Sequence, residues 1–189
     1  MDSFRKIPFY RPSVGQDEID EVIAVMRSGW LTAGPRTEQF EREFRTYIQS
    51  PHALAVNSGT AALYLALIAL ELRPGDEVIT SPMTFCSTVH VIIQAGGIPI
   101  LADVNEDGNI DPKSAQNRIT SATKGLLVVH LGGVPCDMDE LWLIAKQHNL
   151  FVIEDAAHAT GSQYRGRPIG AADLKGKLHS NAVAFSFYA

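Results

Sequence analysis

From Ala53 onward, the chain alternates short apolar runs with longer stretches of helical character. The apolar runs are ALAV (53–56), EVIT (77–80), IPILADV (98–104), GLLVVH (125–130), LFVIE (150–154) and VAFSFYA (183–189). Strands that are apolar along their whole length are typical of sheets covered on both faces, and a helix between successive strands makes those strands parallel. The repetition therefore predicts an α/β fold, a three-layer αβα sandwich around a mostly parallel, mixed sheet.

Two amphipathic helices are expected before this repetition, over Gly15–Ser28 and Thr37–Gln49. In each of them, apolar residues recur at the spacing of one helix face. We therefore expect residues 1–50 to form an amino-terminal helical segment that packs on a larger domain of residues 51–189.

Polar residues mark the starts of several helices. Ser13 and Gln16 stand at capping-box spacing, as do Asp137 and Glu140, and Asp111 is followed directly by a proline. Caps of this kind accept hydrogen bonds from N–H groups that the helix itself leaves unpaired. These residues predict where the helices that follow them begin.

The composition excludes several functional classes. A net charge of −5 with 16 scattered basic residues gives no nucleic-acid surface, and no apolar run approaches the roughly 20 residues that span a membrane. Cys86 and Cys136 lie far apart without disulfide or metal-ligand spacing, which favours a reducing compartment, the cytoplasm. No metal site is expected, because the histidines lack zinc-helix spacing and the calcium-like run Asp103–Gly108 has Ser114 where a glutamate ligand would stand.

Candidate ligand-binding residues lie at the ends of the predicted strands. Open parallel sheets bind ligands where the carboxyl ends of their strands meet the following loops. The residues at these ends are Asn57–Thr60, Thr84–Phe85, His130, Asp155 and Ser186. At Asn57–Thr60 a helix begins after a strand, and free N–H groups there favour an anion such as phosphate, with the Ser58 and Thr60 hydroxyls as further donors.

Each of these features also has a purely structural explanation. Ser58 and Thr60 are common helix caps, a ring such as that of Phe85 more often lies in a core, and Asp155 needs only solvent, a cap or a cation. Neither a dinucleotide fingerprint nor a P-loop motif is present. Taken together, however, a phosphate-binding helix start, an aromatic platform, an acid and a further hydroxyl at Ser186 describe a pyridoxal phosphate (PLP) pocket.

An ordered set of motifs supports this interpretation along essentially the whole chain. The motifs are PFYRPSVGQDEIDEVIAVMRSGWLTAGPRTEQFEREF, AVNSGTAALYLAL, GDEVITSPMTF, HLGGVPCDMDEL, IEDAAHATGSQYRGRPIG and AFSFYA. The chain closely resembles the amino-terminal part of the nucleotide-sugar aminotransferases, the DegT/DnrJ/StrS family of fold-type I PLP enzymes.

The resemblance implies roles for individual residues around the cofactor. Ser58, Gly59 and Thr60 would bind the phosphate, with Ser186 as a second phosphate donor, and Phe85 would cover the cofactor ring.

The resemblance also implies the catalytic and substrate-binding residues. Asp155 would hold the ring nitrogen protonated, and His158 would face the phenolic oxygen of the ring. Trp30, Leu31 and Thr32 would help to line the substrate side and the subunit interface.

Two features depart from the family pattern. Gly132 and Gly133 follow the His-Leu pair, where the family often has an aromatic or polar residue. The family's Schiff-base lysine is expected just beyond Ala189, and the small carboxy-terminal domain is expected to follow it. We therefore expect this chain by itself to lack transaminase activity.

The resemblance implies an enzyme, a PLP-dependent aminotransferase that converts a nucleotide-linked keto-sugar into an amino-sugar with glutamate as donor. A cytoplasmic homodimer without nucleic-acid or membrane partners is expected. Two alternatives stay open: a sugar dehydratase of the same family, in which histidine replaces the lysine, and a non-catalytic PLP-binding or regulatory protein. The residue at the lysine position distinguishes the three.

Overall fold

The computed structural model describes residues 12–173 and 175–187, which fall into two units with a boundary after Phe40. The first unit contains α1 (Gln16–Ser28) and the beginning of α2 (Pro35–Tyr47), which continues into the second unit. Both predicted helices are therefore present. In the described part of the chain, no helix has the length and apolar character that crossing a membrane requires.

Gly15, and not Ser13, stands at the start of α1. The Gly15 N–H donates to Glu18 Oε2 over 2.6 Å, and the helix ends at Gly29, whose φ of 74° lies in the left-handed region that glycine favours. The predicted capping box of Ser13 with Gln16 is wrong, because Gln16 is already the first helical residue and a cap must directly precede the first turn.

The second unit is built around a five-stranded sheet in which every strand is parallel to its neighbours. The strands, in spatial order, are β2 (Ile98–Leu101), β1 (Glu77–Thr80), β3 (Thr123–Val129), β4 (Phe151–Ala156) and β7 (Ala182–Phe185). The only antiparallel pair of strands in the described residues is a separate hairpin, β5 (Gln163–Tyr164) with β6 (Arg167–Pro168).

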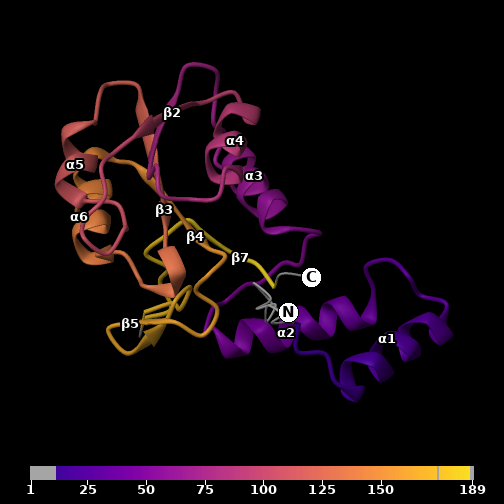
Figure 1. The fold of residues 1–189 in the computed structure, drawn as a ribbon. Coiled ribbons are helices and arrows are strands. Elements are labelled where there is room, and N and C mark those ends of the chain that lie inside the picture. The colour runs from indigo at the N-terminus through magenta and orange to yellow at the C-terminus, as the bar shows by residue number, and fades with distance from the viewer. Residues whose placement is uncertain (1–11, 174, 188–189) are drawn as a thin grey trace, which may run out of the picture. The chain divides into compact units, whose positions relative to one another are not determined.

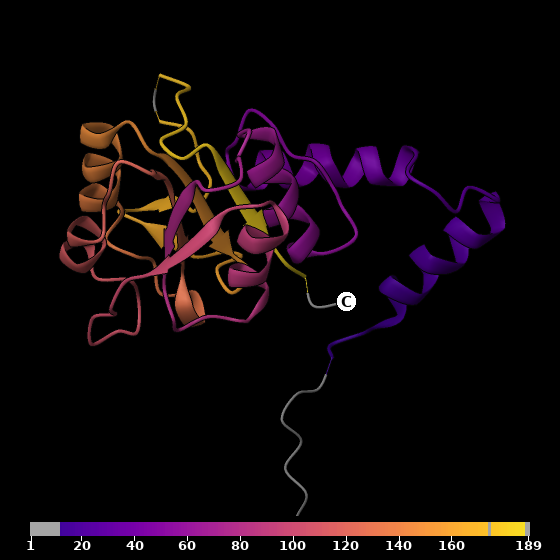
Figure 2. The same cartoon turned by 90° about the horizontal axis from the view of Figure 1, so that it is seen from above.

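Helices cover both faces of this sheet. α3 (Gly59–Ala69) and α4 (Ser87–Gln94) lie on one face, and α5 (Pro112–Asn117) and α6 (Met138–His148) lie on the other (Figure 1, Figure 2). A short 3₁₀ turn, Leu131–Gly133, follows β3. The three-layer α/β arrangement predicted from the apolar runs is confirmed.

Side chains of the central strands alternate between the two helix layers. Val152 of β4 packs in the core beneath α5 and α6, whereas its neighbour Ile153 packs in the core beneath α3 and α4. Because successive side chains of a strand point to opposite faces, the next two residues, Glu154 and Asp155, also point in opposite directions. The two adjacent carboxylates therefore belong to different environments.

Only one of the two predicted aspartate caps in this unit is present. Asp111 accepts the N–H groups of Lys113 over 3.1 Å and Ser114 over 3.3 Å at the start of α5, as predicted. Asp137 precedes α6 but makes no side-chain cap, so the predicted capping box is wrong. Its Oδ1 accepts a hydrogen bond from the Tyr164 hydroxyl over 3.1 Å instead, and that hydroxyl accepts the Asp139 N–H in the first turn over 3.2 Å.

Residues 53–56 form no strand, contrary to the prediction from the apolar run ALAV. A strand needs a partner backbone. The Ala55 N–H instead donates to Glu41 Oε1 over 2.8 Å.

Candidate active site

Asp155 and Ser186 lie at the same edge of the sheet. In the parallel register, Asp155 of β4 stands opposite Val129 of β3 and Ala184 of β7, and Ser186 directly follows β7. Parallel strands bring their carboxyl ends, and the loops after them, to one edge. The predicted ligand-binding edge therefore contains both residues.

The start of α3 lies directly against Ser186. A Cβ atom added at Gly59 would stand 3.3 Å from Ser186 Cβ and 3.7 Å from Ser186 Oγ. Ser58 caps the helix, since its Oγ accepts the Ala61 N–H over 3.1 Å. The N–H groups of Gly59 and Thr60 belong to the first turn, which has no intrahelical acceptor for them. A helix start beside a hydroxyl, without an intervening side chain, suits an anion.

Two donors hold the carboxylate of Asp155, which is only 6% exposed. Thr88 Oγ1 donates to Oδ2 over 2.8 Å, and the Ala157 N–H donates to Oδ1 over 3.2 Å. Thr88 lies in the first turn of α4, so the carboxylate sits on the sheet face that carries α3 and α4. Each oxygen keeps acceptor capacity for a further donor, because a carboxylate offers about four lone-pair sites.

Phe85 lies in the loop between β1 and α4 and is 73% exposed. The alternative that this ring belongs to the core is therefore excluded. The Phe85 carbonyl accepts the Thr88 N–H over 3.1 Å, which ties the loop to the start of α4. An exposed ring on a tethered loop can stack on a flat ligand.

His158 follows β4 by one turn and lies at the surface. Its Nδ1 accepts the Gly132 N–H over 3.2 Å, so the neutral ring carries its proton on Nε2. Gly133 has a φ of 84°, and a Cβ added there would stand 2.9 Å from the His158 carbonyl oxygen. Gly133, one of the two glycines that depart from the family pattern, thus allows two loops to approach each other closely.

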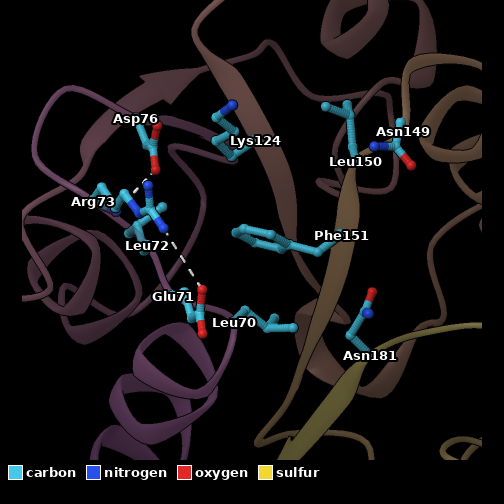
Figure 3. A pocket seen from close by; sticks show the side chains of 10 residues that line it. All are labelled: Leu70, Glu71, Leu72, Arg73, Asp76, Lys124, Asn149, Leu150, Phe151 and Asn181. Atoms are coloured by element: carbon cyan, nitrogen blue, oxygen red, sulfur yellow. Dashed lines mark hydrogen bonds and ion pairs between the residues drawn. The ribbon is translucent and has the colours of Figure 1, made fainter.

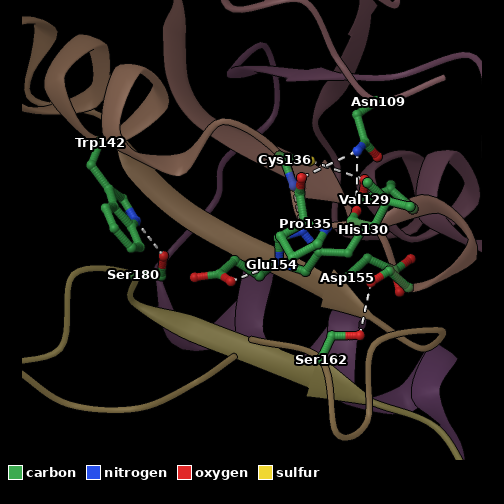
Figure 4. Close-up of polar contacts among 12 residues, drawn as sticks. Asn109, Val129, His130, Pro135, Cys136, Trp142, Glu154, Asp155, Ser162 and Ser180 are labelled. Carbon is green, nitrogen blue, oxygen red and sulfur yellow. Dashed lines mark hydrogen bonds and ion pairs between the residues drawn. The ribbon is translucent and has the colours of Figure 1, made fainter. Parts of the chain in front are cut away.

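His130 does not belong to this site, although it ends a strand. Its side chain is fully buried, and its Nε2 lies 2.8 Å from Glu154 Oε2 (Figure 4). Its Nδ1 accepts the Cys136 N–H over 3.1 Å, which leaves the proton on Nε2 to be donated to the glutamate. The pair is therefore an internal hydrogen bond on the face opposite Asp155, and it removes His130 from the predicted ligand-binding edge.

Cys136, beside this pair, is not a nucleophile. Burial, and then the nearby Glu154 carboxylate, raise the pKa of the Cys136 thiol to about 12. The thiol donates to the Val129 carbonyl over 3.1 Å. A thiol that stays protonated at neutral pH is inert.

The predicted substrate-side residues Trp30, Leu31 and Thr32 belong to the first unit. The side chains of Trp30 and Leu31 are exposed, and the Trp30 indole N–H donates to the Ala33 carbonyl over 3.0 Å. Their role toward a substrate stays a prediction.

An open cavity of about 530 Å³ lies at the other end of the strands (Figure 3). It is lined by residues at the amino-terminal ends of β3, β4 and β7, among them Lys124, Phe151 and Asn181. None of the predicted site residues lines it. It is therefore distinct from the edge that carries Asp155.

The partners of the two adjacent carboxylates, Asp155 in the candidate site and Glu154 on the opposite face, were not predicted from the sequence. Thr88 is a threonine inside an apolar helix, and only its position opposite Asp155 in the fold gives it a role. One feature of the sequence could have indicated the contact of His130 with Glu154. Side chains alternate along β4, so Glu154 lies on the face opposite Asp155, and a buried carboxylate there needs a hydrogen-bond donor.

Comparisons with known proteins bear on the family and the fold of the chain. Residues 12–189 match the DegT/DnrJ/EryC1/StrS aminotransferase family. The spore coat polysaccharide biosynthesis protein SpsC of Bacillus subtilis (strain 168) is 48% identical over 97% of this chain and 46% of its own length. The chain thus spans about half the length of this curated relative.

Solved structures give the same result for the fold. An aminotransferase from Psychrobacter cryohalolentis is 44% identical, with a TM-score of 0.82 over 86% of this chain and 42% of its own. The PLP-form of Spr1654 from Streptococcus pneumoniae is 38% identical, with a TM-score of 0.82 over 87% of this chain and 46% of its own. The structure therefore has the fold of the fold-type I large domain, and the chain belongs to the DegT/DnrJ/EryC1/StrS aminotransferase family.

Proposed function

We propose that the full-length protein is a PLP-dependent aminotransferase that converts a nucleotide-linked keto-sugar into an amino-sugar, with glutamate as amino donor. The observation that carries the proposal is the meeting of the α3 start with Ser186 at the sheet edge that also holds Asp155. Family membership supports the reaction type, and the polysaccharide role in the name of SpsC supports a sugar substrate.

The described residues fit the phosphate of this cofactor. At Gly59, any larger side chain would point at Ser186, so the glycine keeps open the space between the helix start and the hydroxyl. The N–H groups of Gly59 and Thr60, the hydroxyl of Thr60 and the hydroxyl of Ser186 would bind the phosphate. The positive end of the α3 dipole adds attraction for the anion.

The residues also fit the cofactor ring. The Asp155 carboxylate would accept a hydrogen bond from the protonated ring nitrogen. Thr88 and Ala157 already orient this carboxylate. The exposed Phe85 ring would cover one face of the cofactor, and His158 would offer its Nε2 proton to the phenolic oxygen. The fit is supported by the PLP-form of the Spr1654 relative.

When bound, PLP supplies an electron sink that stabilises the carbanion formed in amino transfer. Asp155 would keep the ring nitrogen protonated and so would maintain that electron sink. The α3 start and Ser186 would bind the phosphate equally in ground and transition states, and would therefore set the affinity and the orientation of the cofactor. Trp30, Leu31 and Thr32 would contact the sugar nucleotide.

The assembly belongs to the same proposal: a cytoplasmic homodimer without nucleic-acid or membrane partners. Four apolar side chains along α1 are exposed in this structure, which supports their being covered by another surface in the working protein. They are Ile19, Val22, Ile23 and Met26. Both cysteines are free thiols, which supports a reducing compartment.

The test is glutamate-dependent amination of a panel of nucleotide keto-sugars by the purified full-length protein, followed by mass spectrometry of the product. An added amino group that depends on both PLP and glutamate supports the proposal. Loss of a sugar oxygen without amination would replace it with the dehydratase, and PLP binding without turnover on any keto-sugar would argue against an enzyme.

A further inference from the structure

Two threonine hydroxyl groups are hydrogen-bonded in series to the carboxylate of Asp155. Thr88 Oγ1 lies 2.8 Å from Asp155 Oδ2, and Thr84 Oγ1 lies 2.6 Å from Thr88 Oγ1. Thr88 and Asp155 come from different elements, α4 and β4, and both are buried. The contact therefore crosses from a covering helix to the carboxyl end of the sheet.

The direction of the hydrogen bonds follows from their chemistry. An ionised carboxylate only accepts, so the Thr88 hydroxyl must donate its single proton to Asp155. With that proton committed, Thr88 can only accept from Thr84, whose hydroxyl must donate. Each bond polarises the next, so the two threonines act on Asp155 as a unit.

The same contact connects the acid with the loop that carries Phe85. Thr84 directly precedes Phe85, and the Phe85 carbonyl accepts the Thr88 N–H over 3.1 Å. Thr88 thus bonds the loop through its backbone and Asp155 through its side chain. A change at Thr88 reaches both residues that the proposed function assigns to the cofactor ring.

We propose that Thr88 is a positioning residue for Asp155, that Thr84 fixes Thr88, and that this pair sets the orientation of the carboxylate toward the ring nitrogen of the cofactor. The inference rests on the proposed function. Without the Thr88 hydroxyl, Asp155 Oδ2 loses its only side-chain donor among the described residues, and of these residues only the Ala157 N–H, 3.2 Å from Oδ1, still orients the carboxylate. Small misplacements of a catalytic group are costly to rate.

The chain offers a matched control. Thr80, at the end of β1, is as fully buried as Thr88, but its Oγ1 has no hydrogen-bond partner among the described residues. Thr80→Val and Thr88→Val make the same change of hydroxyl to methyl at two buried positions. Only the second removes a hydrogen bond. Thr88→Ser keeps the hydroxyl and removes the methyl group.

The experiment loads the full-length protein with PLP labelled with ¹⁵N at the ring nitrogen and records its ¹⁵N resonance, together with kcat and KM. We expect Thr88→Val to move the resonance toward its position in Asp155→Asn and to lower kcat about 10- to 100-fold with little change in KM. Thr88→Ser and Thr80→Val should match the wild type in both readouts. Thr84→Val should have a smaller effect in the same direction as Thr88→Val.

The outcomes separate this inference from the proposed function. If Asp155→Asn moves the resonance but Thr88→Val leaves both resonance and kcat unchanged, Asp155 holds the nitrogen without help and the inference is wrong. If Thr80→Val has the same effect as Thr88→Val, general repacking explains both and the inference is also wrong. If the wild-type protein binds no PLP, or Asp155→Asn leaves the resonance in place, the proposed function itself fails.

Discussion

Gly59 lies so close to Ser186 that a Cβ atom on the glycine would stand 3.3 Å from that of the serine. The two residues come from opposite ends of the second unit's sequence, one at the start of α3 and the other just after β7. Their proximity brings the N–H donors of the α3 start close to the Ser186 hydroxyl. The proposed phosphate site depends on this relationship.

Thr60→Ala and Ser186→Ala are expected to weaken PLP binding more than they slow the chemistry. In the proposed site, each would remove a phosphate contact of equal strength in the ground and transition states. Loss of one such hydrogen bond to a charged group, about 1.5–3 kcal/mol, corresponds to roughly a 10- to 150-fold higher Kd. Activity measured against added PLP checks this. Ser121→Ala, an exposed serine, is the control. Activity that saturating PLP fails to restore would place these residues outside the phosphate site.

Asp155→Asn and Glu154→Gln should have different effects although the residues are adjacent. Asp155→Asn is expected to lower turnover at least about a hundredfold, near 3 kcal/mol of barrier, while PLP still binds. Glu154→Gln weakens the buried contact with His130 and should lower the free energy of unfolding by about 1–3 kcal/mol instead. Turnover at saturating PLP and urea denaturation measure the two effects. Equal loss of turnover in both variants would contradict the assignment of Asp155.

Gly133→Ala is expected to destabilise the protein more than Gly132→Ala does. Both glycines have positive φ, 84° and 59°, so alanine is strained at either position by about 1 kcal/mol. Only at Gly133 would the new Cβ meet a backbone atom, the His158 carbonyl oxygen at 2.9 Å, whereas the space at Gly132 is open. Denaturation curves of the two variants test this order. A Gly132→Ala variant as unstable as Gly133→Ala would show that strain alone matters.

Cys136 should resist alkylation at pH 8 in the folded protein, whereas the exposed Cys86 should react. Iodoacetamide labelling followed by peptide mapping distinguishes the two, and both should react in urea. The raised pKa of Cys136 also predicts a pH effect. The unfolded thiol, with a pKa near 9.0, loses its proton before the folded one, whose pKa is about 12. Its contribution to stability is therefore complete below pH 9 and declines above it. Equal labelling of both cysteines in the folded protein would contradict this account.

Much of the fold could be predicted because the sequence carries strong local signals. The apolar runs that became β1, β3 and β4 are uninterrupted, and Asp111 with its following proline marks the start of α5 clearly. The prediction of a helix cap was wrong at Asp137, because the Tyr164 hydroxyl, from another part of the fold, donates to that carboxylate. The prediction of a strand over residues 53–56 was wrong, because a strand needs a neighbouring strand to pair with as well as a suitable composition.

Placement at the carboxyl edge of the sheet could be predicted from strand ends, whereas contacts between elements could not. Asp155 and Ser186 were proposed from their positions at the ends of predicted strands, and the structure places both at one edge of the sheet. His130 satisfied the same criterion but turned inward to Glu154, since the last side chain of a strand can lie on either face. The contact of Thr88 with Asp155 joins two elements far apart in the sequence, and no local pattern indicates it.

The most direct test of the central claim is a crystal structure of the full-length protein grown with PLP. The account predicts the phosphate at the α3 start, between the Gly59 and Thr60 N–H groups and the Ser186 hydroxyl, with the ring nitrogen at hydrogen-bond distance from the Asp155 carboxylate. PLP bound at any other place, or a ring nitrogen that faces solvent away from Asp155, would contradict it.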